Sequence, residues 1–217
     1  MSVPTSDQLE DIWAEVPSDY YFNLNALQRL WHEWKWLVLK YLATLDAYDP
    51  KTILEVGCAG GHLSGLLAQL FPEARITGVD VYAPAIKEAK KRFPQLTFKA
   101  ADAHSLPFKT HTFDLVLSSE TIEHVVDPAK MLGEIARVMK PGGKAIVEMD
   151  SGSALFRLIW FFWTRWGRGV VWKNAHLHPF SASELECLIK GNGFIIKRKI
   201  LSHFGMAVSF LISHNSV

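Results

Sequence analysis

The feature that most constrains this chain is a short apolar run that ends in a turn of small residues. The run Thr52–Val56 is followed by Gly57-Cys58-Ala59-Gly60-Gly61. Apolar residues then recur on one helical face between His62 and Leu70. A buried strand that enters a glycine-rich turn and then a helix is typical of parallel sheets, which bind ligands at the carboxyl ends of their strands.

Strands and helices alternate along most of the remaining chain. Proline or an N-cap residue marks the start of several helices, at Pro84, at Asp127-Pro128 and at Ser181 with Glu184 three residues later. We predict further strands at 75–79, 96–100, 113–118, 144–148, 194–200 and 206–213, with a turn at Pro141-Gly142-Gly143 before the fifth strand. This alternation predicts an α/β fold with a doubly wound, mostly parallel sheet.

The first fifty residues are predicted to be helical. Thr5 and Gln8 could cap a short helix that reaches Trp13, and a longer helix is expected from Asn25 to about Leu45. This second helix carries Trp31, Trp34 and Trp36. We expect these rings to pack against the sheet or to line a cleft, and the alternative is a membrane or partner surface.

Composition and charge exclude several classes of protein. The chain has 217 residues, of which 49% are hydrophobic, and its formal net charge is +1, so neither general disorder nor charge-driven DNA binding is expected. Two cysteines do not make a disulfide scaffold, and no signal peptide is recognised, so we expect a cytoplasmic protein. We predict one domain with a helical cap (1–50), a ligand-binding core (51–150), an inserted segment (151–180) and a C-terminal unit (181–217).

Three acidic residues are expected at or near neighbouring strand ends. Glu55 precedes Gly57 by two positions, where its charge disfavours pyrophosphate and suits an ammonium group. Asp80 ends the second strand and could accept hydrogen bonds from ribose hydroxyls, and Asp102 could accept one from an adenine amine. Because neither a P-loop nor a clean dinucleotide fingerprint is present, the pattern points away from NAD and towards a ligand that carries an ammonium group.

These motifs together resemble the class I S-adenosylmethionine-dependent methyltransferases. The resemblance rests on residues 55–61, Asp80, residues 101–103, residues 113–116 and residues 140–143, with Ala59 where the family usually has glycine. It implies a seven-stranded sheet whose last strand is antiparallel, and S-adenosylmethionine as the methyl donor, with S-adenosylhomocysteine as its product. The residues implied in binding it are Glu55, Gly57, Cys58, Ala59, Gly61, Asp80, Val81, Asp102, Ala103, Ser118, Ser119 and Arg29.

The stretch from Glu120 to Pro128 is similar to ubiquinone-pathway O-methyltransferases and to small-RNA 2′-O-methyltransferases. In such proteins a Glu-x-x-Glu-His group can bind a divalent metal, and here Glu120, Glu123 and His124 match it, with His176 or His178 as a distant fourth ligand. We favour the interpretation without a metal, in which His124 is a general base supported by Glu120 or Glu123.

The segment Ser151–Pro179 is rich in aromatic and basic residues. Leu158, Phe161, Phe162 and Trp166 would share one helical face, with Trp160 and Trp163 on a neighbouring one, so simple solvent exposure is not expected. We expect a lid over the active site, buried against the tryptophan-bearing helix, and the alternative is a lid that also admits a large apolar acceptor or touches a membrane.

The sequence therefore predicts methyl transfer to an apolar or aromatic small molecule, at oxygen. The alternatives are a non-catalytic binding module, a nucleotide-dependent oxidoreductase, or a methyltransferase acting on RNA or protein. No DNA partner is expected, and the sequence indicates neither the identity of the acceptor molecule nor an oligomeric state.

Overall fold

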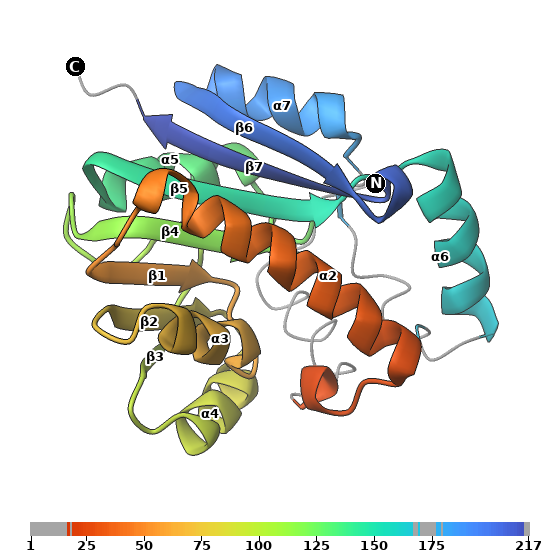
Figure 1. Cartoon of the computed structure of the whole chain (residues 1–217), viewed down its shortest axis with the longest axis horizontal. Helices are drawn as coiled ribbons and strands as arrows, with labels where there is room; N and C mark the ends of the chain where they lie inside the picture. Colours follow the sequence, from red (N-terminus) through yellow and green to blue (C-terminus); the bar gives the residue numbers. More distant parts are fainter. Residues whose placement is uncertain (1–16, 18, 167–168, 170–176, 179, 215–217) are drawn as a thin grey trace.

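The computed structural model describes residues 17, 19–166, 169, 177–178 and 180–214. A seven-stranded sheet forms its centre, with strand order β3-β2-β1-β4-β5-β7-β6 (Figure 1). The strands are β1 (Thr52–Val56), β2 (Arg75–Asp80), β3 (Thr97–Ala100), β4 (Phe113–Ser119), β5 (Met139–Asp150), β6 (Phe194–Ser202) and β7 (Ala207–His214). The helices are α2 (Ala26–Ala43), α3 (His62–Leu70), α4 (Ala83–Arg92), α5 (Pro128–Val138), α6 (Ala154–Trp166) and α7 (Ala182–Gly191), with short 3-10 turns η1 (Tyr20–Phe22), η2 (Leu45–Ala47) and η4 (His203–Gly205).

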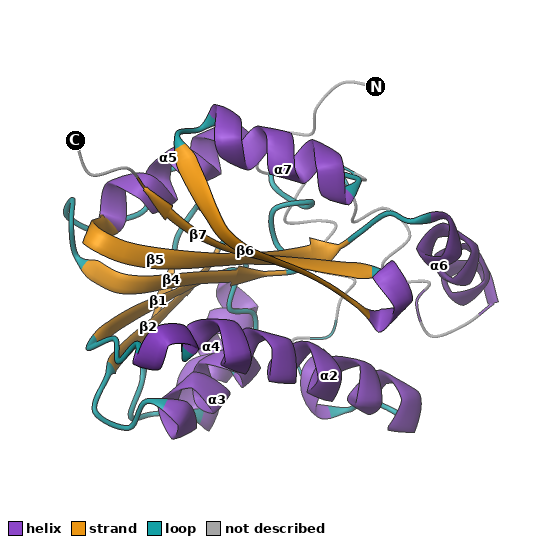
Figure 2. Ribbon diagram, turned by 45° about the horizontal axis from the view of Figure 1, so that its top comes forward, coloured by secondary structure: helices purple, strands orange, loops and turns teal. Residues whose placement is uncertain are grey.

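The pairing of the strands confirms the predicted fold class. Strands β1 to β5 are parallel, and β7 lies antiparallel between β5 and β6. Helices α2, α3 and α4 cover one face of the sheet and α5 and α7 cover the other (Figure 2). The chain is therefore doubly wound, and the strand ends that should hold a ligand all lie at one edge.

Local capping explains where the helices begin. The Asn25 side chain accepts a hydrogen bond from the backbone of Gln28, and the Gln28 side chain accepts one from the backbone of Asn25. Ser181 and Glu184 form the same reciprocal box, and Asp127 caps α5 ahead of Pro128. These three starts agree with the sequence prediction, whereas the helix expected at 5–13 lies outside the described residues.

One predicted boundary is wrong by more than two residues. Strand β5 begins at Met139, not at Lys144, and it includes the Pro141-Gly142-Gly143 segment that we expected to be a separate turn. The ladder with β4 steps from Phe113–Met139 to Leu115–Lys144, so the glycines form a bulge within the strand. Gly142 has a φ of 76°, which a residue with a side chain rarely adopts.

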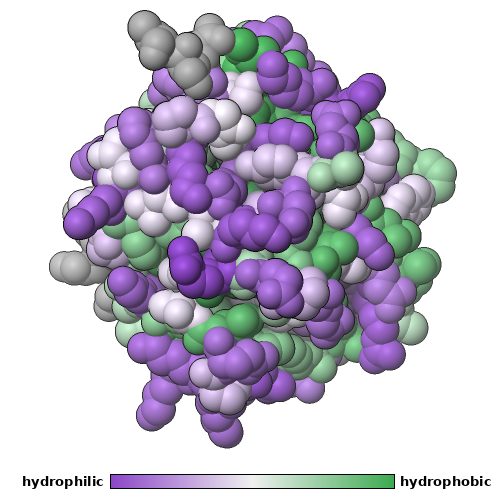
Figure 3. All heavy atoms as spheres, turned by 60° about the vertical axis from the view of Figure 1, so that its left-hand side comes forward, coloured by the Kyte–Doolittle hydropathy of each residue, from purple (hydrophilic) through white to green (hydrophobic). Residues whose placement is uncertain are grey.

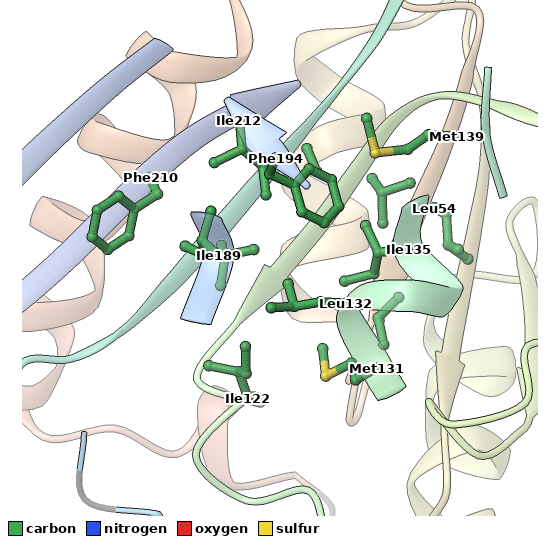
Figure 4. Packing of buried hydrophobic residues seen from close by; sticks show 14 of the residues in the cluster. Leu54, Ile122, Met131, Leu132, Ile135, Met139, Ile189, Phe194, Phe210 and Ile212 are labelled. Carbon is green, nitrogen blue, oxygen red and sulfur yellow. The ribbon is translucent and has the colours of Figure 1, made fainter. Parts of the chain in front are cut away.

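The core lies on both faces of the sheet. Between the sheet and helices α5 and α7, fully buried side chains such as Leu132, Ile135 and Phe210 pack together (Figure 4). On the other face, Leu39 and Leu42 of α2 pack with Leu67 of α3. This packing fixes the strands whose ends form the site.

Candidate active site

A cavity of about 860 Å³ opens at the carboxyl ends of the parallel strands. One wall comes from the segments that follow β1 to β5, and the opposite wall comes from α2 and α6. The strand register sets Gly57, Asp80, Ala101 and Glu120 side by side at this edge, because Val56 pairs with Val79, Asp80 with Ala100, and Glu55 with Leu117. The sheet thus brings together most of the predicted site residues.

The turn after β1 requires glycine at its first position. Gly57 has a φ of 80°, and a Cβ atom there would lie 2.1 Å from the Thr121 Oγ1 atom of the loop after β4. Ala59 also has a positive φ, of 43°, at the position where related sequences usually carry glycine. The turn therefore packs closely against the loop after β4 and holds Ala59 in a strained conformation.

Asp80 lines the cavity with its carboxylate held by the backbone. Its two oxygens accept hydrogen bonds from the N–H groups of Ala59 (2.8 Å) and Tyr82 (2.9 Å). Burial raises the pKa of Asp80 and these hydrogen bonds oppose the rise. Asp80 is thus a fixed hydrogen-bond acceptor on the cavity wall, and its role toward ribose hydroxyls stays a prediction.

Asp102 belongs to a hydrogen-bonded group that the sequence did not indicate. Its Oδ1 atom lies 2.6 Å from His104 Nδ1, and His104 Nε2 accepts a hydrogen bond from the Asp127 backbone N–H at 3.0 Å. His104 thus connects the loop after β3 to the start of α5. Asp102, Ala103 and Val81 all line the cavity. The adenine contact expected of Asp102 and Ala103 stays a prediction.

Glu55 does not line the cavity. It is buried, and its carboxyl group accepts a hydrogen bond from the Ser64 hydroxyl of α3. Burial raises the pKa of Glu55 to about 8. The structure therefore places Glu55 behind the glycine turn, where it connects β1 to α3 and does not face an ammonium group in the cavity.

A buried ion-pair cluster lies at the ends of β4 and β5. The Lys35 ammonium group of α2 lies 2.6 Å from Glu120, 2.9 Å from Asp150 and 3.1 Å from Glu148. Burial alone would lower the pKa of Lys35, but the three carboxyl groups raise it well above its usual range. Although burial would raise the pKa of Glu120, Lys35 and His32 lower it to about 2. Burial raises the pKa of Asp150 to about 7 despite Lys35.

The two other predicted catalytic residues also line the cavity. Glu123 and His124 are buried, with 3% and 6% of their surfaces exposed. Both carboxyl oxygens of Glu123 lack a hydrogen-bond partner among the described residues, and burial raises the pKa of Glu123 well above its usual range. Glu123 is thus suited to hold a proton, and His124 lines the same cavity beside it.

The described residues do not fit a metal ion. No group of three or more histidine, cysteine or acidic residues is arranged to hold one in the described part of the chain, and His176 lies outside it. The carboxylate of Glu120 is already bound to the Lys35 ammonium, which places a cation where a divalent metal would need that ligand. His178 instead stacks on Phe180 and lies 3.4 Å from the Val126 carbonyl.

Of the remaining predicted residues, some line the cavity and others lie outside its lining. Ser119 lines the cavity and donates a hydrogen bond to Glu148, whereas Ser118 and Cys58 are buried. Gly61 begins α3 in a left-handed conformation. Arg29 is exposed and is not among the lining residues, and its neighbour Gln28 lines the cavity instead.

Helix α6 divides its side chains between the cavity and the outside. Phe156, Trp160 and Trp163 line the cavity, as a lid would require. The expectation that α6 avoids simple solvent exposure was wrong for its outer face, where Phe162 and Trp166 are 52% and 70% exposed. On α2, the rings of Trp31 and Trp34 lie 4.1 and 4.8 Å from the ring of His203 in η4, tilted by 40° and 42°.

Sequence reasoning missed Lys35, Glu148 and Asp150. A signal was present, since Lys35 is the one charged residue on the buried face of α2 with Leu39 and Leu42. Glu148 and Asp150 alternate at the end of β5 and face the same side. A lysine on an apolar face predicts buried acidic partners, which these two residues and Glu120 provide.

Comparison with known proteins concerns the segment that forms most of this site. Residues 54–147 match the family model described as a methyltransferase domain, and they span β1 to β5 with the glycine turn and Asp80. This segment therefore belongs to the class I S-adenosylmethionine-dependent methyltransferases.

Similar proteins include two enzymes named for quinone biosynthesis. The chain is 36% identical over 110 residues to a ubiquinone biosynthesis O-methyltransferase of Coxiella burnetii, which covers 49% of this chain and 46% of that protein. It is 29% identical over 130 residues to a ubiquinone/menaquinone biosynthesis C-methyltransferase of Desulfotalea psychrophila, with coverage of 58% and 52%. The chain thus spans about half the length of these relatives.

A solved structure extends the likeness of fold across the chain. A putative methyltransferase of Haloferax volcanii, in complex with a Trm112 methyltransferase activator, has a TM-score of 0.73 at 18% identity and covers 95% of this chain and 98% of that one. At this identity the likeness concerns the fold alone.

Proposed function

We propose that this chain transfers a methyl group from S-adenosylmethionine to an apolar or aromatic small molecule, at a hydroxyl oxygen. The observation that carries the proposal is that one cavity joins the glycine turn and Asp80 to an apolar wall from α6. The family match supports the methyl donor, and the wall formed by Phe156, Ile159, Trp160 and Trp163 supports the class of acceptor.

The residues present fit the methyl donor. Gly57 and Ala59 line the cavity, Asp80 offers a fixed acceptor for ribose hydroxyls, and Val81 and Ala103 offer apolar surface for a purine. S-adenosylmethionine supplies, when bound, a methyl carbon already activated by its sulfonium. The chain then needs only to align the acceptor, exclude water and remove a proton.

His124 is our candidate for the base. It lines the cavity next to Glu123 on the loop after β4, and its ring could take the proton of the acceptor hydroxyl as the oxygen–methyl bond forms. The electron pair of the broken carbon–sulfur bond remains on sulfur, so no oxidant or covalent enzyme intermediate is needed. Glu120 is held as an anion by Lys35 and can stabilise the protonated ring.

The relatives differ in the atom that their names say they methylate, which makes the acceptor the point to test. Methyl-labelled S-adenosylmethionine should be incubated with the protein and with separate pools of solvent-extractable metabolites, RNA and protein. We expect label in the solvent-extractable pool. Label in RNA or protein would refute the proposed acceptor class, and binding without any transfer would favour a non-catalytic module.

A further inference from the structure

The outer faces of α2 and α6 are apolar, which is the reverse of an ordinary surface helix. On α6 the exposed side chains recur every three or four residues and are 44 to 70% exposed; they include Leu155, Leu158, Ile159, Phe162 and Trp166. On α2 a second exposed row is 41 to 79% exposed and comprises Leu27, Leu30, Trp34, Leu37 and Tyr41. We call these two rows the outer apolar face.

The short turn η4 lies between the two helices in both ribbon views (Figures 1 and 2). Its Phe204 is 83% exposed, and its ring lies 5.9 Å from that of Trp34. Exposed apolar residues thus occur on three neighbouring elements. The side of the molecule turned away from α6 is mostly hydrophilic, with smaller apolar patches (Figure 3). An apolar surface of this kind, rimmed by charge, marks an interaction site.

The charges on these helices are mostly positive. Exposed basic residues on α2 and α6 are Arg29, Lys40, Arg157 and Arg165, against one exposed acidic residue, Glu33. The net charge of the whole chain is only +1, so this excess is local. A second copy of the chain would bring the same excess against itself across a two-fold axis. An anionic surface complements the charge and the apolar side chains together.

The cavity opens on this same face. Leu27 of α2 and Ile159 of α6 are 79% and 49% exposed, and both also line the cavity. The outer apolar face is therefore continuous with the apolar wall of the site. No described helix is long and apolar enough to cross a bilayer, so contact with a membrane would be at its surface.

We infer that the outer apolar face docks on the surface of a phospholipid bilayer with anionic headgroups. Leu158, Phe162 and Trp166 enter the interface, and Arg157 and Arg165 contact the headgroups. The docking rests on this surface alone. Its consequence, that an apolar acceptor passes from the lipid into the cavity between α2 and α6, rests on the proposed function.

The test is co-sedimentation with vesicles of phosphatidylcholine, with and without phosphatidylglycerol. We expect the wild type to bind the anionic vesicles, and we expect added salt to weaken this binding. Leu158→Glu combined with Phe162→Glu should weaken partitioning at least about tenfold, equivalent to about 1.4 kcal/mol. Ile195→Glu, a 39% exposed side chain on β6, is the matched control and should bind like the wild type. Thermal unfolding shows whether each variant is folded.

A variant without the two arginines separates the electrostatic contribution to binding from the apolar contribution. Arg157→Gln with Arg165→Gln should weaken binding to anionic vesicles several-fold and leave binding to phosphatidylcholine unchanged. Failure of the wild type to bind either vesicle, or an equal loss in Ile195→Glu, would overturn the inference. A wild-type dimer that the Leu158 and Phe162 changes dissociate would also overturn it, in favour of a second copy. Vesicle binding without methyl transfer would refute the proposed function and leave the docking intact.

Discussion

The Lys35 ammonium group lies 2.6 Å from a carboxylate oxygen of Glu120, and this contact connects α2 to the loop after β4. The same ammonium also contacts the end of β5, through Asp150 and Glu148. Because α2 forms part of the cavity wall, the ion pairs position one wall of the site against the strand ends that form the other. Lys35 is therefore a positioning residue.

Removing the positive charge of Lys35 should destabilise the folded protein. Lys35→Met leaves buried carboxyl groups without their cation, and we expect it to lower the free energy of unfolding by about 3–5 kcal/mol. Lys40→Met, on the exposed side of the same helix, should change it by less than about 0.5 kcal/mol. Chemical denaturation at neutral pH measures both. Equal effects would show that the ion pairs do not stabilise the position of α2.

Glu55 should make stability depend on pH. Its pKa is about 8 in the folded chain against an ordinary value of 4.5, so between these values the folded state keeps a proton that the unfolded state loses. Stability contributed by the protonated carboxyl is present below about pH 4.5 and falls as pH rises towards 8, by up to about 1.4 kcal/mol per pH unit. Glu55→Gln should remove that slope. Parallel curves for wild type and variant, from denaturation at several pH values, would contradict the assignment.

The folded protein should be more stable with glycine in place of Ala59. Its φ of 43° strains an L-residue, and this strain exceeds the entropy that glycine adds to the unfolded chain. We expect Ala59→Gly to raise the free energy of unfolding by about 0.5–1 kcal/mol, while Ala59→Val should lower it. Urea unfolding compares the three proteins, and a destabilised glycine variant would mean that the turn is not strained.

His124 should affect turnover without affecting the methyl donor. Its ring faces the acceptor region in our proposal, so His124→Ala should keep the affinity for S-adenosylmethionine and lower turnover by roughly 10²–10⁴. Calorimetry and a methyl-transfer assay measure the two quantities separately. If affinity and turnover fall together, His124 is structural. Inhibition of the wild type by a chelator, reversed by added metal, would favour the metal-dependent alternative.

The sequence predicts the order of strands and helices because each apolar run and each cap is local. Thr52–Val56 and His62–Leu70 have the bounds that their patterns predict. The Lys35 cluster is different, because its acidic partners lie as many as 115 positions away and come together only when the sheet forms. The sequence pattern also did not predict the orientation of α6, because its apolar residues lie on nearly every face and do not indicate which side is covered.

Calorimetric titration with S-adenosylmethionine, and separately with NAD, tests the central claim most directly. The account predicts binding of S-adenosylmethionine and none of NAD. It also predicts a loss of about 1.5–3 kcal/mol in Asp80→Ala, because the ribose hydroxyls lose their charged acceptor. Binding of NAD in preference to S-adenosylmethionine, or an unchanged affinity in a folded Asp80→Ala protein, would contradict it.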